Sequence, residues 1–321
     1  MVRVLCTALN GESGPHFGML QDAGHECCVV DRRLNLWDPA VLISAVKDFD
    51  AVIAGSEPWP ADVIAAVPRV RVLARAGVGF DAIHLPTCDE RRVVVATTPG
   101  CNHHSVAEHT IAMLMAVGRG FPALDQEVRR GEWNRNAQPR IWGRTLGLVG
   151  LGRIGQATAI RAIGLGMQVI AYDPFPPVAF AAQHGIPLVP LEQLITDSDF
   201  ISLHLPASAQ TRHMINDDSI ARMKQGVVII NTARGPLIDE AALIRGLQSG
   251  KVRGAGLDVF ETEPLPLSSP LIGMSNVMLA GHVAGLDNES HDATWALAAD
   301  IILRLQRGEW PADNFLIRGT R

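Results

Sequence analysis

Short hydrophobic runs alternate with longer stretches of mixed polarity along almost the whole chain. Continuous apolar runs of this kind are typical of strands buried on both faces, as in parallel sheets that helices cover on either side. The runs form two sets. The first comprises residues 2–6, 27–30, 51–54, 70–74 and 93–97, and the second comprises residues 145–149, 168–172, 200–205, 227–231, 254–259 and 276–280.

Two long helical stretches accompany these strands. The stretch 105–118 connects the two sets, and Ser105 and Glu108 have the spacing of a capping box at its start. The stretch 289–307 follows the second set, and its apolar residues recur at helical spacing. We therefore expect an α/β protein with two doubly wound, parallel-sheet domains of the Rossmann or flavodoxin-like kind, and a last helix that returns to the first domain.

A glycine-rich segment opens the second set. Residues 146–156 read L-G-L-V-G-L-G-R-I-G-Q, and a helix-compatible stretch and a second apolar run follow. This is the order of elements that a dinucleotide cofactor requires. Gly150 permits a tight turn, Gly152 lets a pyrophosphate approach the backbone, and Gly155 lets the helix pack closely on the strand. We expect a nucleotide site here; an ordinary strand–helix turn is the alternative.

An acid ends the run that follows the glycines. Asp173 lies 18 residues beyond Gly155, close to the ~20 expected of a carboxylate that grips the ribose hydroxyls. Pro174 and Phe175 follow it, and no arginine stands there. Because a carboxylate at this position repels a 2′-phosphate, the sequence favours NAD over NADP.

Composition narrows the class of protein further. The chain has 321 residues, of which 47% are hydrophobic, and a net charge of −5 without a basic tract, so nucleic acid is not an expected partner. Its apolar stretches are broken before the ~18 residues that span a bilayer, and no membrane partner is expected. The cysteines have no C-x-x-C spacing, which favours reduced thiols in a cytoplasmic protein over disulfides or a metal site. These cysteines are Cys6, Cys27, Cys28, Cys88 and Cys101.

Polar segments follow three strands of the second set, at the sheet edge where open α/β sheets bind ligands. Arg234 has a forked guanidinium that suits a carboxylate, although a surface ion pair is the more common role of such a residue. Asp258, Glu261 and Glu263 stand in the next segment, which a solvated acidic loop also explains. His282 ends the last strand between glycines, where a structural and a catalytic role are both open.

Together these residue types suit hydride transfer to a keto acid. The arginine would hold the substrate carboxylate and polarise the carbonyl, and the histidine would exchange the hydroxyl proton. The acid would fix the histidine tautomer and favour its imidazolium form. A nicotinamide would carry the hydride.

At this point the chain resembles the D-isomer-specific 2-hydroxyacid dehydrogenases, especially the phosphoglycerate dehydrogenase-like members. The resemblance spans nearly the whole chain and rests on several motifs in the same order. They are A-G-V-G-F-D-A-I (76–83), T-P-G-C-N-H-H-S-V-A-E-H (98–109), G-L-V-G-L-G-R-I-G (147–155), L-H-L-P-A-S-A-Q-T (203–211), N-T-A-R-G-P-L-I-D (231–239), L-D-V-F-E-T-E-P (257–264) and G-H-V-A-G (281–285).

The resemblance implies roles for individual residues. It assigns catalysis to Arg234, Glu263 and His282, and it selects Glu263 over Glu261. It also implies that the backbone at Val78 and Gly79 cradles the substrate carboxylate, with Asn102 near the cleft. The positions that match family residues around the cofactor are Gly150, Gly152, Arg153, Ile154, Gly155, Asp173, His204, Pro206, Thr211, Thr232, Asp258 and Gly285. Family members work as dimers or larger assemblies, so a homodimer or larger homo-oligomer is expected.

The chain also departs from the family pattern. Ala280 and Gly281 replace the usual Thr-Pro before the histidine, and Asp287 stands where a threonine is usual, which puts loop geometry and substrate choice in doubt. The chain ends before the C-terminal regulatory domains of longer phosphoglycerate dehydrogenases, which argues against serine feedback of that type. Arg75, just before the A-G-V-G segment, could meet a substrate phosphate, and a structural ion pair explains it equally well.

We therefore expect an NAD-dependent oxidoreductase that interconverts a small D-2-hydroxyacid and its 2-keto acid in a cleft between two domains. Residues 1–98 plus 288–321 form the expected substrate (catalytic) domain, and residues 99–287 the NAD-binding Rossmann domain. The candidate substrates are 3-phosphoglycerate, hydroxypyruvate, glyoxylate and bulkier keto acids. Two alternatives stay open: an NAD-responsive, corepressor-like binding protein, and a formate dehydrogenase, whose members lack a carboxylate partner for the histidine.

Overall fold

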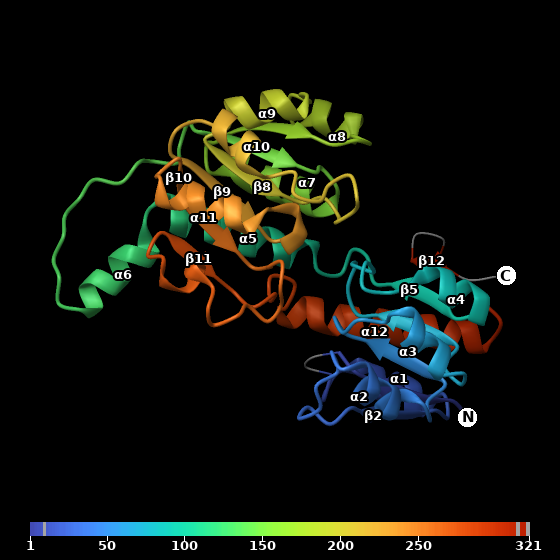
Figure 1. The fold of residues 1–321 in the computed structure, drawn as a ribbon. Coiled ribbons are helices and arrows are strands. Elements are labelled where there is room, and N and C mark those ends of the chain that lie inside the picture. Colours follow the sequence, from blue (N-terminus) through green and yellow to red (C-terminus); the bar gives the residue numbers. More distant parts are fainter. Residues whose placement is uncertain (9–10, 313–314, 319–321) are drawn as a thin grey trace. The chain divides into compact units, whose positions relative to one another are not determined.

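The computed structural model describes residues 1–8, 11–312 and 315–318, and the chain divides into two compact units. Unit 1 consists of Met1–Asn102 with Leu286–Arg321, and unit 2 of His103–Gly285. The boundaries differ by only a few residues from those expected after residues 98 and 287. Each unit contains one six-stranded sheet with helices on its faces (Figure 1).

The sheet of unit 1 has the strand order β12-β5-β4-β3-β1-β2. Five strands are parallel, as the continuous apolar runs predict, and β12 pairs antiparallel with β5. The short β12 was not predicted from the sequence. The elements are β1 (Arg3–Cys6), α1 (Pro15–Asp22), β2 (Glu26–Val29), α2 (Pro39–Val46), β3 (Ala51–Ala54), α3 (Ala61–Ala66), β4 (Val72–Arg75), α4 (Leu85–Arg91), β5 (Val94–Thr97), α12 (Asn288–Gln306) and β12 (Leu316–Arg318).

Helix α12 packs in unit 1, although it follows the second sheet in the sequence. Asp287 caps its N-terminus by accepting a hydrogen bond from the Ser290 backbone N–H (2.6 Å). The apolar face that the sequence indicated is buried against the sheet, with Trp295 and Ile301 almost fully inaccessible to solvent. Burial of this face explains why the last long helix belongs to the first unit.

The sheet of unit 2 has the order β11-β10-β9-β8-β6-β7, and all its strands are parallel. The order reverses beside β6, which is the strand that leads into the glycine turn. The elements are α5 (His103–Gly118), α6 (Phe121–Arg129), β6 (Thr145–Val149), α7 (Arg153–Gly164), β7 (Gln168–Tyr172), α8 (Val178–Gln183), α9 (Leu191–Asp197), β8 (Phe200–Leu203), α10 (Asp217–Arg222), β9 (Val227–Asn231), a 3-10 turn η1 (Gly235–Leu237), α11 (Glu240–Gln248), β10 (Val252–Leu257), a 3-10 turn η2 (Pro270–Gly273) and β11 (Val277–Leu279).

The start of α5 differs from the sequence-based expectation. The helix begins at His103, so Ser105 lies inside its first turn and does not act as an N-cap. The Ser105 hydroxyl instead donates to the carbonyl oxygen of Ala284 (2.7 Å). The capping-box prediction is therefore wrong: the spacing was present, but the hydroxyl makes a long-range contact with the segment beside His282.

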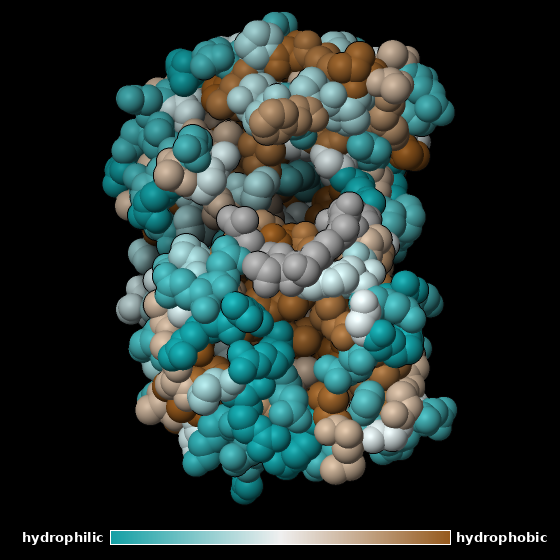
Figure 2. Space-filling view, turned by 90° about the vertical axis from the view of Figure 1, so that its right-hand side faces the viewer, coloured by the Kyte–Doolittle hydropathy of each residue, from teal (hydrophilic) through white to brown (hydrophobic). Residues whose placement is uncertain are grey.

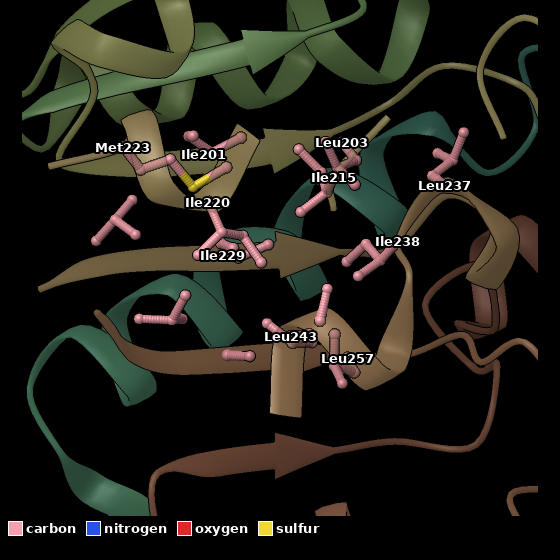
Figure 3. Packing of buried hydrophobic residues seen from close by; sticks show 14 of the residues in the cluster. Ile201, Leu203, Ile215, Ile220, Met223, Ile229, Leu237, Ile238, Leu243 and Leu257 are labelled. Atoms are coloured by element: carbon pink, nitrogen blue, oxygen red, sulfur yellow. The ribbon is translucent and has the colours of Figure 1, made fainter. Parts of the chain in front are cut away.

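Buried aliphatic side chains hold the central strands of unit 2 against helices α10 and α11 (Figure 3). Ile201 comes from β8, Ile229 from β9 and Leu257 from β10, and they meet Ile220 of α10 and Leu243 of α11. Burial of an aliphatic side chain of this size stabilises the fold by roughly 1.5–3 kcal/mol. This packing fixes the ends of β9 and β10, from which two of the candidate catalytic residues follow.

One element of unit 2 has no buried side chain. Helix α6 and the segment leading to Trp142 project from the rest of the unit (Figure 1), and Phe121, Val128 and Trp133 are 56%, 58% and 80% exposed. The face shown in Figure 2 carries hydrophilic residues interspersed with groups of hydrophobic ones. Within the described residues, every helix is too short or too polar to cross a bilayer.

Candidate active site

The glycine turn after β6 has the geometry that a pyrophosphate needs. Gly150 has φ +104°, and a Cβ there would lie 2.8 Å from the backbone of His204. A Cβ on Gly155 would lie 2.2 Å from the Gly150 carbonyl oxygen, so the close approach of α7 to the turn requires glycine. At Gly152, by contrast, a Cβ would point into open space. The turn therefore leaves room beside the exposed backbone at the N-terminus of α7, as a dinucleotide requires.

Asp173 stands at the end of β7, next to this turn. One carboxylate oxygen accepts the Leu151 backbone N–H (2.7 Å), and the other accepts the Phe175 N–H (2.8 Å). The side chain thus braces the glycine turn in addition to presenting a negative charge. Each carboxylate oxygen can accept a further hydrogen bond, so these contacts are compatible with a ribose hydroxyl as a third partner.

The segment after β8 carries three more candidates. The Thr211 hydroxyl donates to the Pro206 carbonyl oxygen (2.8 Å) and closes the turn between them. His204 lies within 3.0 Å of the Ser202 hydroxyl, and burial lowers the pKa of His204 to about 4. The imidazole is therefore neutral at pH 7 and acts as a hydrogen-bonding group, without charge. Three other cofactor candidates, Arg153, Ile154 and Gly285, are partly or fully exposed.

Asp258, at the end of β10, holds the segment that carries His282. Its carboxylate is fully buried and accepts backbone N–H groups of Val283 (2.8 Å) and Ala284 (2.9 Å), and its carbonyl oxygen accepts the His282 N–H (2.7 Å). His282 has φ +58°, a left-handed conformation that a non-glycine residue seldom adopts. The Asp258 contacts hold this backbone in place. A contact of Asp258 with the cofactor stays a prediction.

Glu263 and His282 form a hydrogen-bonded dyad. Nδ1 of His282 lies 2.8 Å from one carboxylate oxygen of Glu263, and the other oxygen accepts the Phe260 N–H (3.0 Å). Burial raises the pKa of Glu263, but the hydrogen bond and charge of His282, the Phe260 N–H and the charge of Arg234 outweigh it, so the pKa lies below its ordinary value. Glu263 is therefore a carboxylate at pH 7. It holds Nδ1 and leaves Nε2 of His282 available for proton exchange.

Arg234 follows β9 and precedes η1. Its backbone is held by Asn231, whose side-chain amide donates to the Arg234 carbonyl oxygen (2.8 Å). Its charge favours the ionised form of Glu263 and helps to lower the pKa of that carboxyl group. The structure thus places Glu263 in contact with His282, with the charge of Arg234 acting on the same carboxylate, and the catalytic role of the three residues stays a prediction. Thr232, two residues earlier, is buried and bonds to the Thr110 hydroxyl (2.8 Å).

In unit 1, the segment around Val78 and Gly79 follows β4. Thr98 fixes it, because the Thr98 hydroxyl accepts the Gly77 N–H (2.7 Å) and the Thr98 N–H donates to the Gly77 carbonyl oxygen (3.0 Å). Among the described residues, the N–H groups of Val78 and Gly79 have no intrachain acceptor. Two adjacent free N–H groups are suited to a carboxylate.

Arg75 lies near a buried acid of the same unit. Glu57 is 3% exposed and accepts hydrogen bonds from the Thr7 hydroxyl (2.5 Å) and the Trp59 indole (3.3 Å). Burial raises the pKa of Glu57, while Thr7 and the charge of Arg75 act in the opposite direction. This favours the structural role that the sequence left open for Arg75. Asn102, the other candidate of unit 1, has a buried side-chain oxygen without a hydrogen-bond donor.

Several contacts around the site were not predicted from the sequence. Ser105 and Thr110 of α5 reach the Ala284 carbonyl and Thr232, and His213 bonds to Glu261 across 48 positions of the chain. A single sequence carries no signal for such pairs, because each joins segments far apart in the chain. The glycine turn, the acid after β7 and the Arg–Glu–His set nevertheless define a dinucleotide-dependent oxidoreductase of the doubly wound class.

Comparison with known proteins places the chain within that class. The family model described as the D-isomer specific 2-hydroxyacid dehydrogenase, NAD binding domain, matches residues 111–284, more than half of the chain. A glyoxylate reductase of Korarchaeum cryptofilum is 40% identical over 294 residues, which cover 88% of this chain and 89% of that protein. The chain belongs to the D-isomer specific 2-hydroxyacid dehydrogenases, a family of NAD-dependent enzymes.

Two further relatives show the range of the family. A D-3-phosphoglycerate dehydrogenase of Mycobacterium bovis is 41% identical over 281 residues, covering 87% of this chain and 53% of that protein. The chain thus spans about half the length of the phosphoglycerate dehydrogenases it matches. The crystal structure of D-lactate dehydrogenase from Aquifex aeolicus, complexed with NAD and lactic acid, has a TM-score of 0.85 and 27% identity, covering 99% of this chain and 100% of that one.

Proposed function

We propose that the chain reduces a small, unphosphorylated 2-keto acid to the D-2-hydroxyacid with NADH, and catalyses the reverse reaction. The observation that carries this proposal is the contact between His282 and Glu263. Because Glu263 holds Nδ1, His282 protonates the carbonyl oxygen through Nε2 during reduction and accepts that proton during oxidation. Glu263 keeps the ring in position and stabilises the imidazolium form.

The remaining candidates bind and orient. The bound nicotinamide supplies or accepts the hydride. Arg234 pairs with the substrate carboxylate and polarises the carbonyl group. In unit 1, the N–H groups of Val78 and Gly79, which have no acceptor among the described residues, suit a carboxylate, and in unit 2 Asp173 binds the cofactor ribose.

Glyoxylate and hydroxypyruvate are the substrates that the site supports best. A phosphorylated substrate needs a second cation, and Arg75 was the candidate. Its charge acts on the buried Glu57, which favours a structural role. The glyoxylate reductase also matches this chain over nearly its whole length, in keeping with the same choice. The second candidate is 3-phosphoglycerate, which the identity to the phosphoglycerate dehydrogenases favours.

A kinetic comparison tests the choice. We expect kcat/KM with NADH to be highest for glyoxylate or hydroxypyruvate, and lower by at least about tenfold for the 2-keto form of 3-phosphoglycerate, a transition-state difference of about 1.4 kcal/mol. Faster turnover of this phosphorylated keto acid would overturn the choice of substrate. In that case Arg75→Ala is the next variant to measure. If Arg75 binds the phosphate, this variant should lower kcat/KM for phosphorylated substrates but not for unphosphorylated ones.

A variant of the dyad tests the chemistry itself. His282→Ala should lower kcat by ~10²–10⁴, the usual contribution of a general acid or base. Binding of NADH, followed by its fluorescence, should persist, because His282 is not among the residues proposed to hold the cofactor. Near-normal turnover by this variant would show that His282 is not the general acid or base. A second outcome concerns the unaltered protein: if it binds the cofactor but turns over no keto acid, a sensor function is favoured.

We also propose that the chain forms a homodimer or larger homo-oligomer through α6 and the segment 131–143. The support is the exposed apolar surface of Phe121 and Val128 on α6, a helix that has no buried side chain, and of Trp133 in the segment that follows. A second copy of the chain could cover this surface by an isologous contact.

A further inference from the structure

A second histidine–glutamate pair involves the same segment as the proposed dyad. Nε2 of His213 lies 2.5 Å from one carboxylate oxygen of Glu261, which is separated from Glu263 by a single residue. The side chains of His213 and Glu261 are 31% and 29% exposed. An ion pair of this exposure contributes little to folding stability, so its position calls for another explanation.

Glu261 joins the segment that carries Glu263 to helix α11. The Glu261 backbone N–H donates to the Glu240 carboxylate (2.5 Å), and the second oxygen of Glu261 accepts the Glu240 backbone N–H (3.4 Å). With His213, the Glu261 side chain therefore contacts both the segment before α10 and the start of α11. These contacts fix one side of the segment 260–263, while the Phe260 N–H fixes the Glu263 carboxylate.

The backbone of His213 is held in an unfavourable conformation. Its φ is +50°, and hydrogen bonds fix it on both sides: its N–H donates to the Pro236 carbonyl oxygen (2.8 Å), and its carbonyl oxygen accepts the Asn216 side-chain amide (2.9 Å). A left-handed residue that is not glycine is strained and persists where the surroundings enforce it. In this conformation the His213 side chain contacts Glu261.

Glu240, at the start of α11, is affected by the charges of both glutamates of this segment. Burial raises the pKa of Glu240, and the charges of Glu261 and Glu263 raise it further. Three carboxyl groups thus interact beside the dyad, and Glu263 draws its own stabilisation from His282 and Arg234.

We propose that His213 and Glu261 are positioning residues that hold Glu263 at hydrogen-bonding distance from His282. The proposal rests on the proposed role of the Glu263–His282 dyad. When the pair is broken, the segment 260–263 loses its contact with the segment before α10, and Glu263 no longer keeps the imidazole in one orientation.

The test uses substitutions that keep the local backbone. His213→Asn removes the imidazole but tolerates the left-handed conformation, because asparagine adopts it readily. Glu261→Gln keeps size and hydrogen bonding but removes the charge. With NADH and the faster of glyoxylate or hydroxypyruvate, each variant should lower kcat about tenfold, within the ~10²-fold that a misplacement of 1 Å can cost. The KM for NADH should change by less than about twofold, because the pair touches no proposed cofactor residue.

A double-mutant cycle and a matched control complete the experiment. If the two residues act as one pair, His213→Asn with Glu261→Gln should be no slower than the slower single variant. Asp217→Asn breaks the neighbouring ion pair with Arg245 (2.6 Å), which does not touch the segment 260–263, and should leave kcat unchanged. If His213→Asn does not fold, Glu261→Gln alone decides.

Three results would overturn the proposal. They are an unchanged kcat, a loss of kcat that matches the loss of folded protein in circular dichroism, and additive effects of the two substitutions. The outcome is distinguishable from failure of the proposed function, because His282→Ala reports on the dyad directly. If His282→Ala turns over substrate normally, the proposed role of the dyad is refuted. If His282→Ala is slow but Glu261→Gln is normal, only the positioning role is refuted.

Discussion

At the scale of single residues, side chains near the proposed site contribute structure as well as chemistry. Asp258 shows this best: the sequence placed it around the cofactor by resemblance, and the structure shows its carboxylate accepting two backbone N–H groups beside His282. A hydrogen bond to a charged group contributes about 1.5–3 kcal/mol. That is comparable to the ~1–3 kcal/mol that a left-handed, non-glycine residue such as His282 costs.

Asp173 also has two roles, and its substitution should separate them. Asp173→Asn should raise the NADP-to-NAD ratio of kcat/KM by roughly tenfold, about 1.4 kcal/mol, because it removes the charge that repels a 2′-phosphate. The amide keeps one oxygen that can accept the Leu151 N–H, so the glycine turn should persist. Kinetics with both cofactors, at one keto acid concentration, measures the ratio.

Asp173→Ala serves as the comparison. It should shift the cofactor ratio in the same direction and also lower the melting temperature, because the N–H groups of Leu151 and Phe175 both lose their acceptor. A cofactor ratio that stays constant in both variants would show that the discrimination between NAD and NADP lies elsewhere.

At the scale of elements, the sequence predicted strands better than contacts. The apolar runs located the described strands β1–β11 to within a few residues, because a strand buried on both faces leaves no polar position. The pattern could not locate β12, a three-residue edge strand whose pairing with β5 depends on residues more than 200 positions away. Likewise, the spacing of Ser105 and Glu108 fits a cap, and only the tertiary contact with Ala284 shows why it is not one.

The same limit applied to the candidate site. Arg234, Glu263 and His282 could be proposed because each follows a strand of one parallel sheet, whose carboxyl ends share an edge. The choice of Glu263 over Glu261 came from resemblance to a family, and it is the glutamate that contacts His282 in the structure. The partner of Glu261, His213, gave no periodic or motif signal, because it lies in an irregular segment.

Gly235 lies against the segment that follows β10, and the importance of this close approach can be tested by substitution. It follows Arg234, and a Cβ there would lie 1.8 Å from the Phe260 carbonyl oxygen. Gly235→Ala must therefore displace either η1 or the segment 260–263, at a cost of roughly 1–3 kcal/mol or more. We expect a lower melting temperature and a fall in kcat larger than the loss of folded protein explains, because Arg234 and Glu263 move apart.

Gly164→Ala is the matched control for this substitution. Gly164 is the last residue of α7, and a Cβ there would meet no atom within 4 Å, so the change should be neutral or stabilising. The account of Gly235 would fail if Gly235→Ala had the same melting temperature and kcat as the Gly164 variant.

At the scale of the whole molecule, the two units share a plan but differ in what they offer. Each has a six-stranded, mostly parallel sheet, yet the dyad and the glycine turn lie in unit 2, while unit 1 presents the free N–H groups of Val78 and Gly79. The last helix returns to unit 1 because its buried face belongs to that core. A sequence pattern reports that such a face exists, but its partner is set by the tertiary fold.

The exposed surface of α6 makes a prediction for the assembly. Three large apolar side chains in solvent are unfavourable, at about 25 cal/mol for each Å² left uncovered, and a second copy of the chain would remove that cost. Phe121→Glu with Val128→Glu places charges on this surface and should convert an oligomer to monomers in size-exclusion chromatography with light scattering. Leu267→Glu, at a residue that is 94% exposed elsewhere in unit 2, should leave the mass unchanged.

Because no proposed catalytic residue lies on α6, monomers should keep the KM for NADH within about twofold. A wild-type protein that is monomeric at every concentration tested would contradict the assembly, and an oligomer that survives both charges would place the contact on another surface.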